Sequence, residues 1–310
     1  MTRRPILVDL MMLLAAVIWG SAFVAQRLSA QDIGPFYYTG LRFLLGALVV
    51  LVFCLLLPAQ RKALRTIPTD VGLLRAGGVL GVVTAIAISA QQIGLQYTKI
   101  ANAGFITSLY VIIVPMMGLF ARHKTATGTW LGAVLAVIGM YFLSVDDHFT
   151  ILLGDWYQLV CAIVISGQVM LVGRYAREHD PLSLSLVQFV ATGLISMAVA
   201  AFTEPMGFAS VRAAMPAILY GGGMSVGIAY TIQVVAQKRA SPAHAAVIFS
   251  MEGLFAAIAG WLVLGETLSL RAIFGCALML TGLIVCQLWP GREREAHTPA
   301  SGGSGVAADA

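Results

Sequence analysis

The sequence predicts an all-α membrane protein in which ten transmembrane helices form two inverted five-helix repeats. Of its 310 residues, 59% are hydrophobic and only 11% are charged, whereas a soluble domain has about 25% charged residues. Its apolar residues occur in long runs, and a helix needs roughly 20 of them to cross a bilayer. Long runs favour helices over barrel strands, whose residues alternate over about ten positions.

Ten apolar runs follow one another along the chain. They are 7–28, 36–57, 72–94, 101–121, 129–146, 152–173, 183–203, 214–236, 243–264 and 270–289. The first run follows Arg3 and Arg4, as a signal peptide would, but its length and the nine runs after it favour a retained helix. Residues 290–310 are rich in Gly, Ser and Ala without periodicity, which predicts a disordered cytoplasmic tail.

The second five runs repeat polar and glycine positions of the first five. The matched pairs are Gln92 with Gln233, Gln96 with Gln237, Asp9 with Asp155, Pro35 with Pro181, Gly132 with Gly275, and Gly139 with Gly282. The repeats therefore cover 1–148 and 149–289. Because each repeat holds an odd number of helices, the second must be inverted in the membrane. Such repeats are typical of carriers that alternate access to a central site.

The last run of each repeat carries two glycines seven residues apart, on nearly one helix face. Small residues let helices approach closely in lipid. We therefore expect these glycines to form a packing seam, and these two helices to lie outside the transport pathway.

The net charge of +5 follows membrane topology and indicates no nucleic-acid partner. With the N-terminus inside, most basic residues lie at cytoplasmic ends of the runs: Arg3, Arg4, Arg61, Lys62, Arg65, Arg122, Lys124, Arg174, Arg177, Lys238, Arg239, Arg292 and Arg294. The opposite ends hold Arg27, Lys99, Arg212 and Arg271. This bias predicts cytoplasmic termini, in a bacterial inner membrane. The spacing of the four cysteines fits no zinc or disulfide framework, and no cofactor is expected.

Two motifs resemble a known family. They are Trp19-Gly20-Ser21-Ala22-Phe23 in the first run, and Ser250-Met251-Glu252 followed by 260–266 in the ninth. With the ten-helix pattern over residues 6–289, they make the chain similar to the EamA branch of the drug/metabolite transporter superfamily, and most of all to YddG-type amino acid exporters. The resemblance implies outward movement of amino acids, aromatic ones included. The chain has Glu252-Gly253 where the family commonly has Glu-Pro.

Polar stripes on the third and eighth runs are candidate walls of a central cavity. Helical spacing aligns Gly81, Ala85, Ser89, Gln92 and Gln96 on the third run, and Gly222, Ser225, Ala229, Gln233 and Gln237 on the eighth. Thr84, which the repeat matches with Ser225, is a further substrate-binding candidate. Glutamine amides both donate and accept hydrogen bonds, so they suit a zwitterionic solute. Gln96 and Gln237 are expected to act as gates near opposite membrane faces. The alternative is plain hydrogen bonding between helices.

Aromatic and ionisable residues near mid-span complete the candidate substrate-binding set. Trp19, Tyr110 and Tyr230 are expected to form an aromatic wall, with core packing as the alternative. Glu252 is an acid deep inside a span and by default a functional candidate. It could bind a solute amine, carry a proton or pair with a basic side chain. Further hydrogen-bonding candidates are Ser21, Ser166, Gln168 and Ser250. Arg42 is expected to snorkel to the outer interface, with carboxylate recognition as the alternative.

These features predict a carrier that exports small metabolites, above all amino acids. The chain has no phosphate-binding Gly-x-x-x-x-Gly-Lys-Ser/Thr loop for an ATP motor, and no obligate protein partner is evident. The alternative is an exporter of cationic drugs or other metabolites with proton coupling through Glu252. A membrane enzyme is disfavoured because the five histidines are scattered, and a channel because the polar stripes are interrupted.

Overall fold

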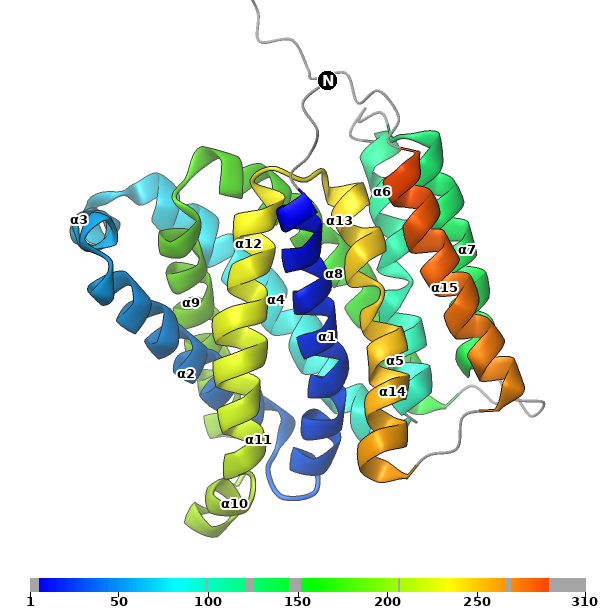
Figure 1. The fold of residues 1–310 in the computed structure, drawn as a ribbon. Helices are drawn as coiled ribbons and strands as arrows, with labels where there is room; N and C mark the ends of the chain where they lie inside the picture. Colours follow the sequence, from blue (N-terminus) through cyan, green and yellow to red (C-terminus); the bar gives the residue numbers. More distant parts are fainter. Residues whose placement is uncertain are drawn as a thin grey trace, which may run out of the picture.

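The computed structural model describes residues 6–98, 100–120, 125–144, 152–205, 207–265 and 269–289, and every regular element within them is a helix (Figure 1). Among these residues, eight helices are long and apolar enough to cross a membrane, and two further apolar helices are shorter. The predicted class of all-helical membrane protein is confirmed. The expected tail, 290–310, lies outside the described residues.

The first five predicted spans form eight helical pieces. They are α1 (Ile6–Ser29), α2 (Pro35–Leu56), α3 (Pro58–Thr66) with the 3₁₀ turn η1 (Ile67–Thr69), α4 (Val71–Tyr97), α5 (Ile100–Ser108), α6 (Tyr110–Phe120) and α7 (Thr127–Ser144). The sequence analysis did not anticipate α3. This helix has no buried residue and carries Arg61, Lys62 and Arg65, so it lies on the surface at the end of α2.

The last five predicted spans are divided more finely. They form α8 (Leu153–Glu178), α9 (Pro181–Thr203), α10 (Phe208–Ala213), α11 (Met215–Tyr220), the π-helix η2 (Gly221–Tyr230), α12 (Thr231–Gln237), α13 (Pro242–Phe249), α14 (Glu252–Leu264) and α15 (Leu270–Leu288). The eighth predicted span therefore contains a wide π segment. π-Helical turns occur preferentially at functional sites.

Two predicted spans are interrupted at corresponding places. Between α5 and α6, the amide of Leu109 donates to Ile106 O at 3.2 Å and Leu109 O accepts from Ile112 N at 3.0 Å. Between α13 and α14, the amide of Met251 donates to Ile248 O at 3.2 Å. These tighter turns of 3₁₀ type break the α-helical pattern. As a result, Tyr110 and Glu252 each begin the second piece of a broken helix.

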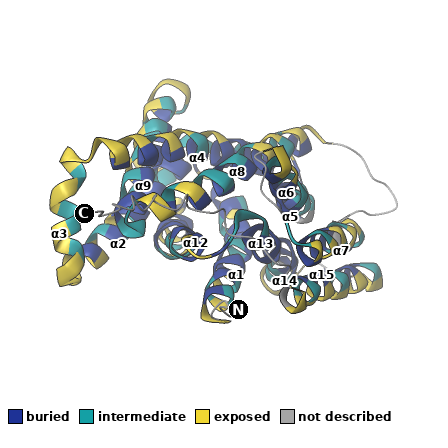
Figure 2. Cartoon of the chain, turned by 90° about the horizontal axis from the view of Figure 1, so that it is seen from above, coloured by how far each residue is buried: buried dark blue, intermediate teal, exposed yellow. Residues whose placement is uncertain are grey.

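Helices from the two halves of the chain interleave in equivalent pairs. α2 packs against α9, and α7 against α15. α4 contacts α8 and α9, and its counterpart in the second half, the segment α11–η2–α12, contacts α1 and α2. In the same way, α1 contacts α14, and its counterpart α8 contacts α5 and α6. Each contact thus has a counterpart when the halves are exchanged. Seen from above, the buried faces point inward and the exposed faces outward (Figure 2).

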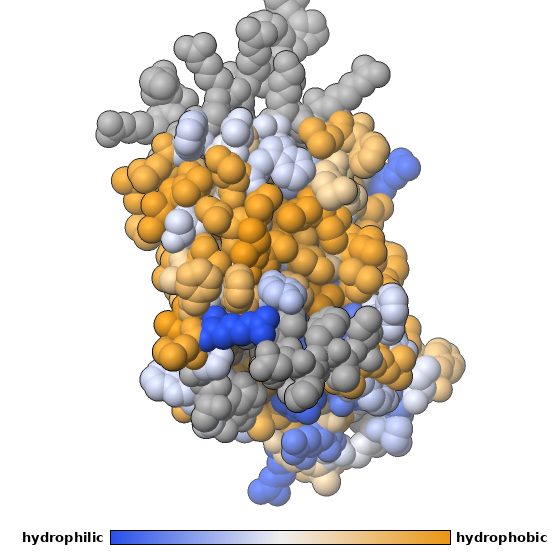
Figure 3. All heavy atoms as spheres, turned by 90° about the vertical axis from the view of Figure 1, so that its right-hand side faces the viewer, coloured by the Kyte–Doolittle hydropathy of each residue, from blue (hydrophilic) through white to orange (hydrophobic). Residues whose placement is uncertain are grey.

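The predicted glycine seam is confirmed, because α7 and α15 meet through their paired glycines. A Cβ added to Gly132 would lie 2.7 Å from Gly282 O, and one added to Gly139 would lie 2.5 Å from Gly275 O. The two helices stand together at one side of the molecule (Figure 1), where the outer surface is a broad apolar band (Figure 3). Their close backbone approach depends on the missing side chains.

The repeat-related acids Asp9 and Asp155 make equivalent ties at helix starts. Asp9 Oδ1 lies 3.0 Å from His244 Nε2, near the start of α13. Asp155 Oδ1 accepts a hydrogen bond of 2.5 Å from the Thr98 hydroxyl, just after α4. Each acid joins the first helix of one half to the junction between the third and fourth helices of the other half.

We expect Gly139→Ala to destabilise the protein. The new methyl group would lie 2.5 Å from Gly275 O and 2.7 Å from the Met279 side chain. Overpacking of this kind costs about 1–3 kcal/mol. The melting temperature of the purified protein should fall by several degrees, at about 2–4 °C per kcal/mol. The matched control is Gly78→Ala in α4, where an added Cβ meets nothing within 4 Å. Equal melting temperatures for the two variants would contradict the seam.

Candidate functional site

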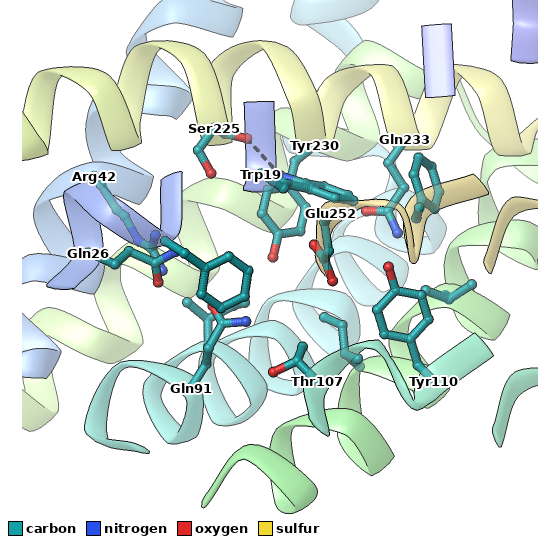
Figure 4. Close-up of a pocket in the computed structure, with 15 residues that line it drawn as sticks. Trp19, Gln26, Arg42, Gln91, Thr107, Tyr110, Ser225, Tyr230, Gln233 and Glu252 are labelled. Carbon is teal, nitrogen blue, oxygen red and sulfur yellow. Dashed lines mark hydrogen bonds between the residues drawn. The ribbon is translucent and has the colours of Figure 1, made fainter. Parts of the chain in front are cut away.

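A cavity of about 520 Å³ of empty space, including its open mouth, lies where helices of the two halves meet. The cavity is lined by Trp19, Phe23, Gln26, Arg42, Ile88, Gln91, Thr107, Tyr110, Ile165, Val169, Ser225, Tyr230, Gln233, Phe249 and Glu252 (Figure 4). α7 and α15 contribute no lining residue, as the seam position requires.

One wall of the cavity is an aromatic cluster built around Tyr230, the last residue of η2. The Trp19 ring lies 4.8 Å from the Tyr230 ring and 5.2 Å from the Phe249 ring, between centroids. The Trp19 indole N–H donates to Ser225 O at 3.2 Å, so a π-helical carbonyl fixes the indole. Such tilted aromatic pairs are favourable beyond the area they bury. The wall is therefore rigid and apolar.

Two side chains of opposite formal charge line the same cavity. Arg42 is only 2% exposed, and its guanidinium lies 4.9 Å from the Tyr38 ring and 5.6 Å from the Phe43 ring. The expected snorkelling of Arg42 is therefore wrong, because these rings hold the side chain inward by cation–π contact. Glu252, at the start of α14, is 5% exposed. Within the described ranges, no ion pair links either charge to another side chain.

Several lining residues also carry buried polar atoms that make no hydrogen bond within the described part of the chain. These atoms are Gln26 Oε1, Arg42 Nε and the Tyr110 hydroxyl. The Tyr110 hydroxyl lies near the Glu252 carboxylate without completing a hydrogen bond to it. Buried polar atoms in proteins are nearly always hydrogen-bonded to protein or water. The cavity thus presents polar groups that a bound molecule or water can satisfy.

The structure brings together five of the predicted substrate-binding residues. Trp19, Tyr110, Tyr230, Gln233 and Glu252 all line the cavity. They belong to α1, α6, η2, α12 and α14, and Figure 4 shows them around the cavity. Tyr110 and Glu252 meet because the two helix breaks face one cavity.

Gln168 lies directly behind the lining. Its amide donates to Gln233 Oε1 at 3.3 Å, and the Gln233 amide donates back to Gln168 Oε1 at 3.1 Å. The two side chains therefore form a reciprocal amide pair that joins α8 to α12. This pair fixes the orientation of the Gln233 amide at the cavity wall.

Gln92 lies outside the lining, although the repeat pairs it with Gln233. Its amide donates to Gln26 O at 3.1 Å and toward Ser29 Oγ at 3.5 Å, so it joins α4 to the end of α1. Its neighbour Gln91 faces the cavity instead. The repeat correctly marked the helix, but a register difference of one residue turns a helix face by 100°.

The remaining predicted residues also lie outside the lining. The Thr84 hydroxyl accepts from Gln188 at 2.9 Å, and the Ser166 and Ser250 hydroxyls donate to carbonyls of their own helices, Ala162 O and Val247 O. Ser21 meets the Tyr220 hydroxyl at 2.6 Å. Ser89 is buried without reaching the cavity. Of the expected gates, Gln237 donates to Val169 O at 3.0 Å, and Gln96 is half-buried.

Sequence reasoning missed several lining residues, although part of the signal was present. Trp19, Phe23 and Gln26 follow the spacing i, i+4 and i+7 on one face of α1. Once Trp19 was a candidate, the same spacing could have identified Phe23 and Gln26. Thr107 lies beside the break between α5 and α6, and no single-residue pattern reveals that break. Ser225 contributes through the π segment, which shifts the helical register.

Comparisons with a family model and with related sequences both identify transporters. The model of the EamA-like transporter family matches residues 6–145 and again 152–287. A transporter of Archaeoglobus fulgidus, itself described only as uncharacterized, is 30% identical over 281 residues, covering 90% of this chain and 85% of its own length. The transporter YoaV of Bacillus subtilis is 22% identical over 285 residues, covering 87% of this chain and 92% of its own length. A crystal structure superimposes with a TM-score of 0.71 at 20% identity, covering 91% of this chain and 96% of the other.

The chain belongs to the EamA-like transporter family. It is a multi-pass membrane transporter and not an enzyme, and the two matches to one family model indicate duplicated halves. The bilayer and a small-molecule solute are therefore its partners. The solute itself follows only from the chemistry of the cavity.

Cysteine scanning tests the cavity without knowledge of the solute. In a background with Cys54, Cys161, Cys276 and Cys286 replaced by alanine, Gln91→Cys should react with a small water-soluble thiol reagent. The matched control is the neighbouring Gln92→Cys, which should react at least about tenfold more slowly because a thiol needs water to ionise and react. Mass spectrometry of the labelled protein gives both rates. Faster labelling at 92 than at 91 would contradict the lining.

Proposed function

We propose that this transporter is a carrier that exports small metabolites, most of all amino acids including aromatic ones, by alternating access. The observation that carries the proposal is the mixed lining of the cavity. A rigid aromatic wall of Trp19, Tyr230 and Phe249 shares the cavity with buried polar atoms of Gln26 and Tyr110 that have no hydrogen-bond partner in the described part of the chain. A solute with an apolar side chain and a polar backbone end matches both surfaces.

The proposed mechanism rests on two five-helix repeats of opposite orientation, 1–148 and 149–289. The equivalent helix pairs support it, because exchanging the halves maps each major contact onto another. The broken helices support it as well, since carriers commonly build their binding sites from discontinuous helices at the interface between repeats. In alternating access, the two halves rock around the fixed cavity.

The proposed location is a bacterial inner membrane with both termini in the cytoplasm. The support is the excess of Lys and Arg at the ends of helices that this topology places inside, among them Arg61, Lys62 and Arg65 of α3. The outward direction of transport rests on the resemblance to YddG-type exporters. Without a nucleotide-binding loop, the solute's own gradient is the proposed driving force.

Purified protein in proteoliposomes should carry labelled Phe or Thr down a concentration gradient. The flux should exceed that of empty liposomes and should saturate with solute concentration, because a carrier binds its solute at a defined site. Unlabelled amino acids should compete, whereas a nucleoside should not. If no amino acid moved faster than in empty liposomes, the proposed substrate class would be wrong.

A second candidate is an exporter of cationic solutes that exchanges them for protons. The observation that favours it is the buried carboxylate of Glu252 beside the cavity, because intramembrane acids often carry protons in transporters. The cation of Arg42 in the same cavity weighs against it, since like charges repel a cationic solute.

Collapsing the pH gradient separates the two candidates. Under our first proposal, downhill amino acid flux should persist, within about a factor of two, when an ionophore equalises the pH across the membrane. The same liposomes should retain a control solute, which shows that they stay sealed. Complete loss of flux on collapse, with Glu252→Gln likewise inactive, would favour the proton exchanger.

A further inference from the structure

We infer that Arg42 and Glu252 are the two poles of one site for a zwitterion, with Arg42 binding the carboxylate and Glu252 the ammonium group of an α-amino acid. This inference rests on the proposed function and deepens it. It assigns each end of the solute to a side chain, and it predicts which analogues the site rejects. The burial of both charges in one cavity, without an ion pair between them among the described residues, carries the inference.

Arg42 is built to receive an anion. Its side chain is 2% exposed, and its guanidinium is held over the Tyr38 ring at 4.9 Å. Its Nε has no hydrogen-bond partner within the described ranges. A planar guanidinium presents parallel N–H groups that match the two oxygens of a carboxylate. An unpaired buried cation is costly, so this position favours an anionic group from the solute.

Glu252 is built to receive a cation. It is 5% exposed at the first residue of α14, where the helix break leaves the side chain directed into the cavity (Figure 4). In the described part of the chain, no Lys, Arg or His lies within ion-pair distance of its carboxylate. The Tyr110 hydroxyl lies near this carboxylate and has no partner in hydrogen-bonding geometry among the described residues, so its oxygen can accept a hydrogen bond from an ammonium group.

The two charges belong to one space but do not neutralise each other. Both line the same cavity, as does Tyr230. No ion pair of 4 Å or less joins them among the described residues. A purely cationic solute would leave Arg42 unpaired, and a purely anionic solute would leave Glu252 unpaired. Only a molecule that carries both charges satisfies both side chains.

The apolar residues of the lining determine which side chains of a bound amino acid the cavity accepts. The same cavity is also lined by the apolar side chains of Phe23, Ile88, Ile165, Val169 and Phe249, together with the Trp19 and Tyr230 rings. A hydrophobic or aromatic side chain can pack there without leaving a polar group unsatisfied. A charged side chain would lack a partner, so the site should prefer apolar amino acids.

Three ligands that share one ring test the poles. They are L-phenylalanine, 2-phenylethylamine without the carboxylate, and 3-phenylpropionate without the amine. Equilibrium binding of each labelled ligand to the purified protein should show the wild type preferring phenylalanine to either analogue by at least about tenfold, the loss expected when a charge-assisted hydrogen bond is removed. This comparison needs no variant, so a folding defect cannot obscure it.

Variants then assign each pole. Arg42→Gln should abolish the preference for phenylalanine over phenylethylamine and keep the preference over phenylpropionate. Glu252→Gln should do the reverse, and Arg42→Lys should recover part of the first preference. The matched controls are Arg75→Gln and Glu178→Gln, which replace exposed charges of the same types and should leave both ratios unchanged. A ratio of two affinities does not depend on the fraction of folded protein.

The outcomes separate this inference from the proposed function. If the wild type transports phenylalanine but binds an analogue equally well, the assignment of poles is overturned while the amino acid carrier stands. If both Arg42→Gln and Glu252→Gln keep the wild-type ratios, the assignment is also overturned, because each substitution removes the charge that the inference requires. If the wild type neither binds nor transports any amino acid, the proposed function itself fails.

Discussion

In a bilayer, every backbone amide and carbonyl must find a partner within the protein, and the rest of this structure depends on that constraint. Unbroken helices satisfy it in α1, α2, α4, α8 and α9. Departures are tolerated where protein surrounds them or where they line a cavity. The chain departs at Leu109, at Ser250–Met251 and across η2. All three departures border the same cavity, so backbone irregularity and the candidate site coincide.

This coincidence explains how the site acquires its mixed chemistry. Each break ends one helical piece and starts another, and the starting residues Tyr110 and Glu252 are thereby directed at the cavity. In η2 the wider winding leaves Ser225 O able to accept the Trp19 indole N–H. The helices α7 and α15, which meet through glycines, carry none of these irregularities in their described residues. The regular, apolar contact between α7 and α15 is therefore separate from the irregular, more polar helices that surround the cavity.

Hydropathy and glycine spacing were enough to predict the helical membrane class, the approximate spans and a glycine packing seam on the last helix of each half. These features depend on composition and period, which a sequence displays directly. The helix breaks were not predicted, because each lies inside an apolar stretch that has the length and hydropathy of a single membrane span. Gln92 was chosen over Gln91 because the repeat marks equivalent positions, whereas cavity lining depends on the helix face.

Arg42 shows a different limit. Its position inside the second span suggested an interfacial side chain, but the Tyr38 and Phe43 rings keep the guanidinium within the protein. These partners lie on the same helix, four residues before and one residue after it. Their rotamers, however, depend on packing against the opposite half, through Phe189 and Tyr230 beside Phe43. Tertiary packing thus decides whether a basic side chain faces lipid headgroups or a cavity.

The reciprocal amide pair of Gln168 and Gln233 has a consequence for movement at the cavity wall. Each amide both donates to and accepts from the other, so the contact between α8 and α12 is complete and uncharged. Neither amide titrates in the physiological range, and salt does not screen a contact between neutral groups as it screens an ion pair. Separating the two helices at this point therefore costs the same at any ordinary pH and ionic strength. Once water has left the space between α8 and α12, the two amides can form their hydrogen bonds again without a change in protonation or a bound ion.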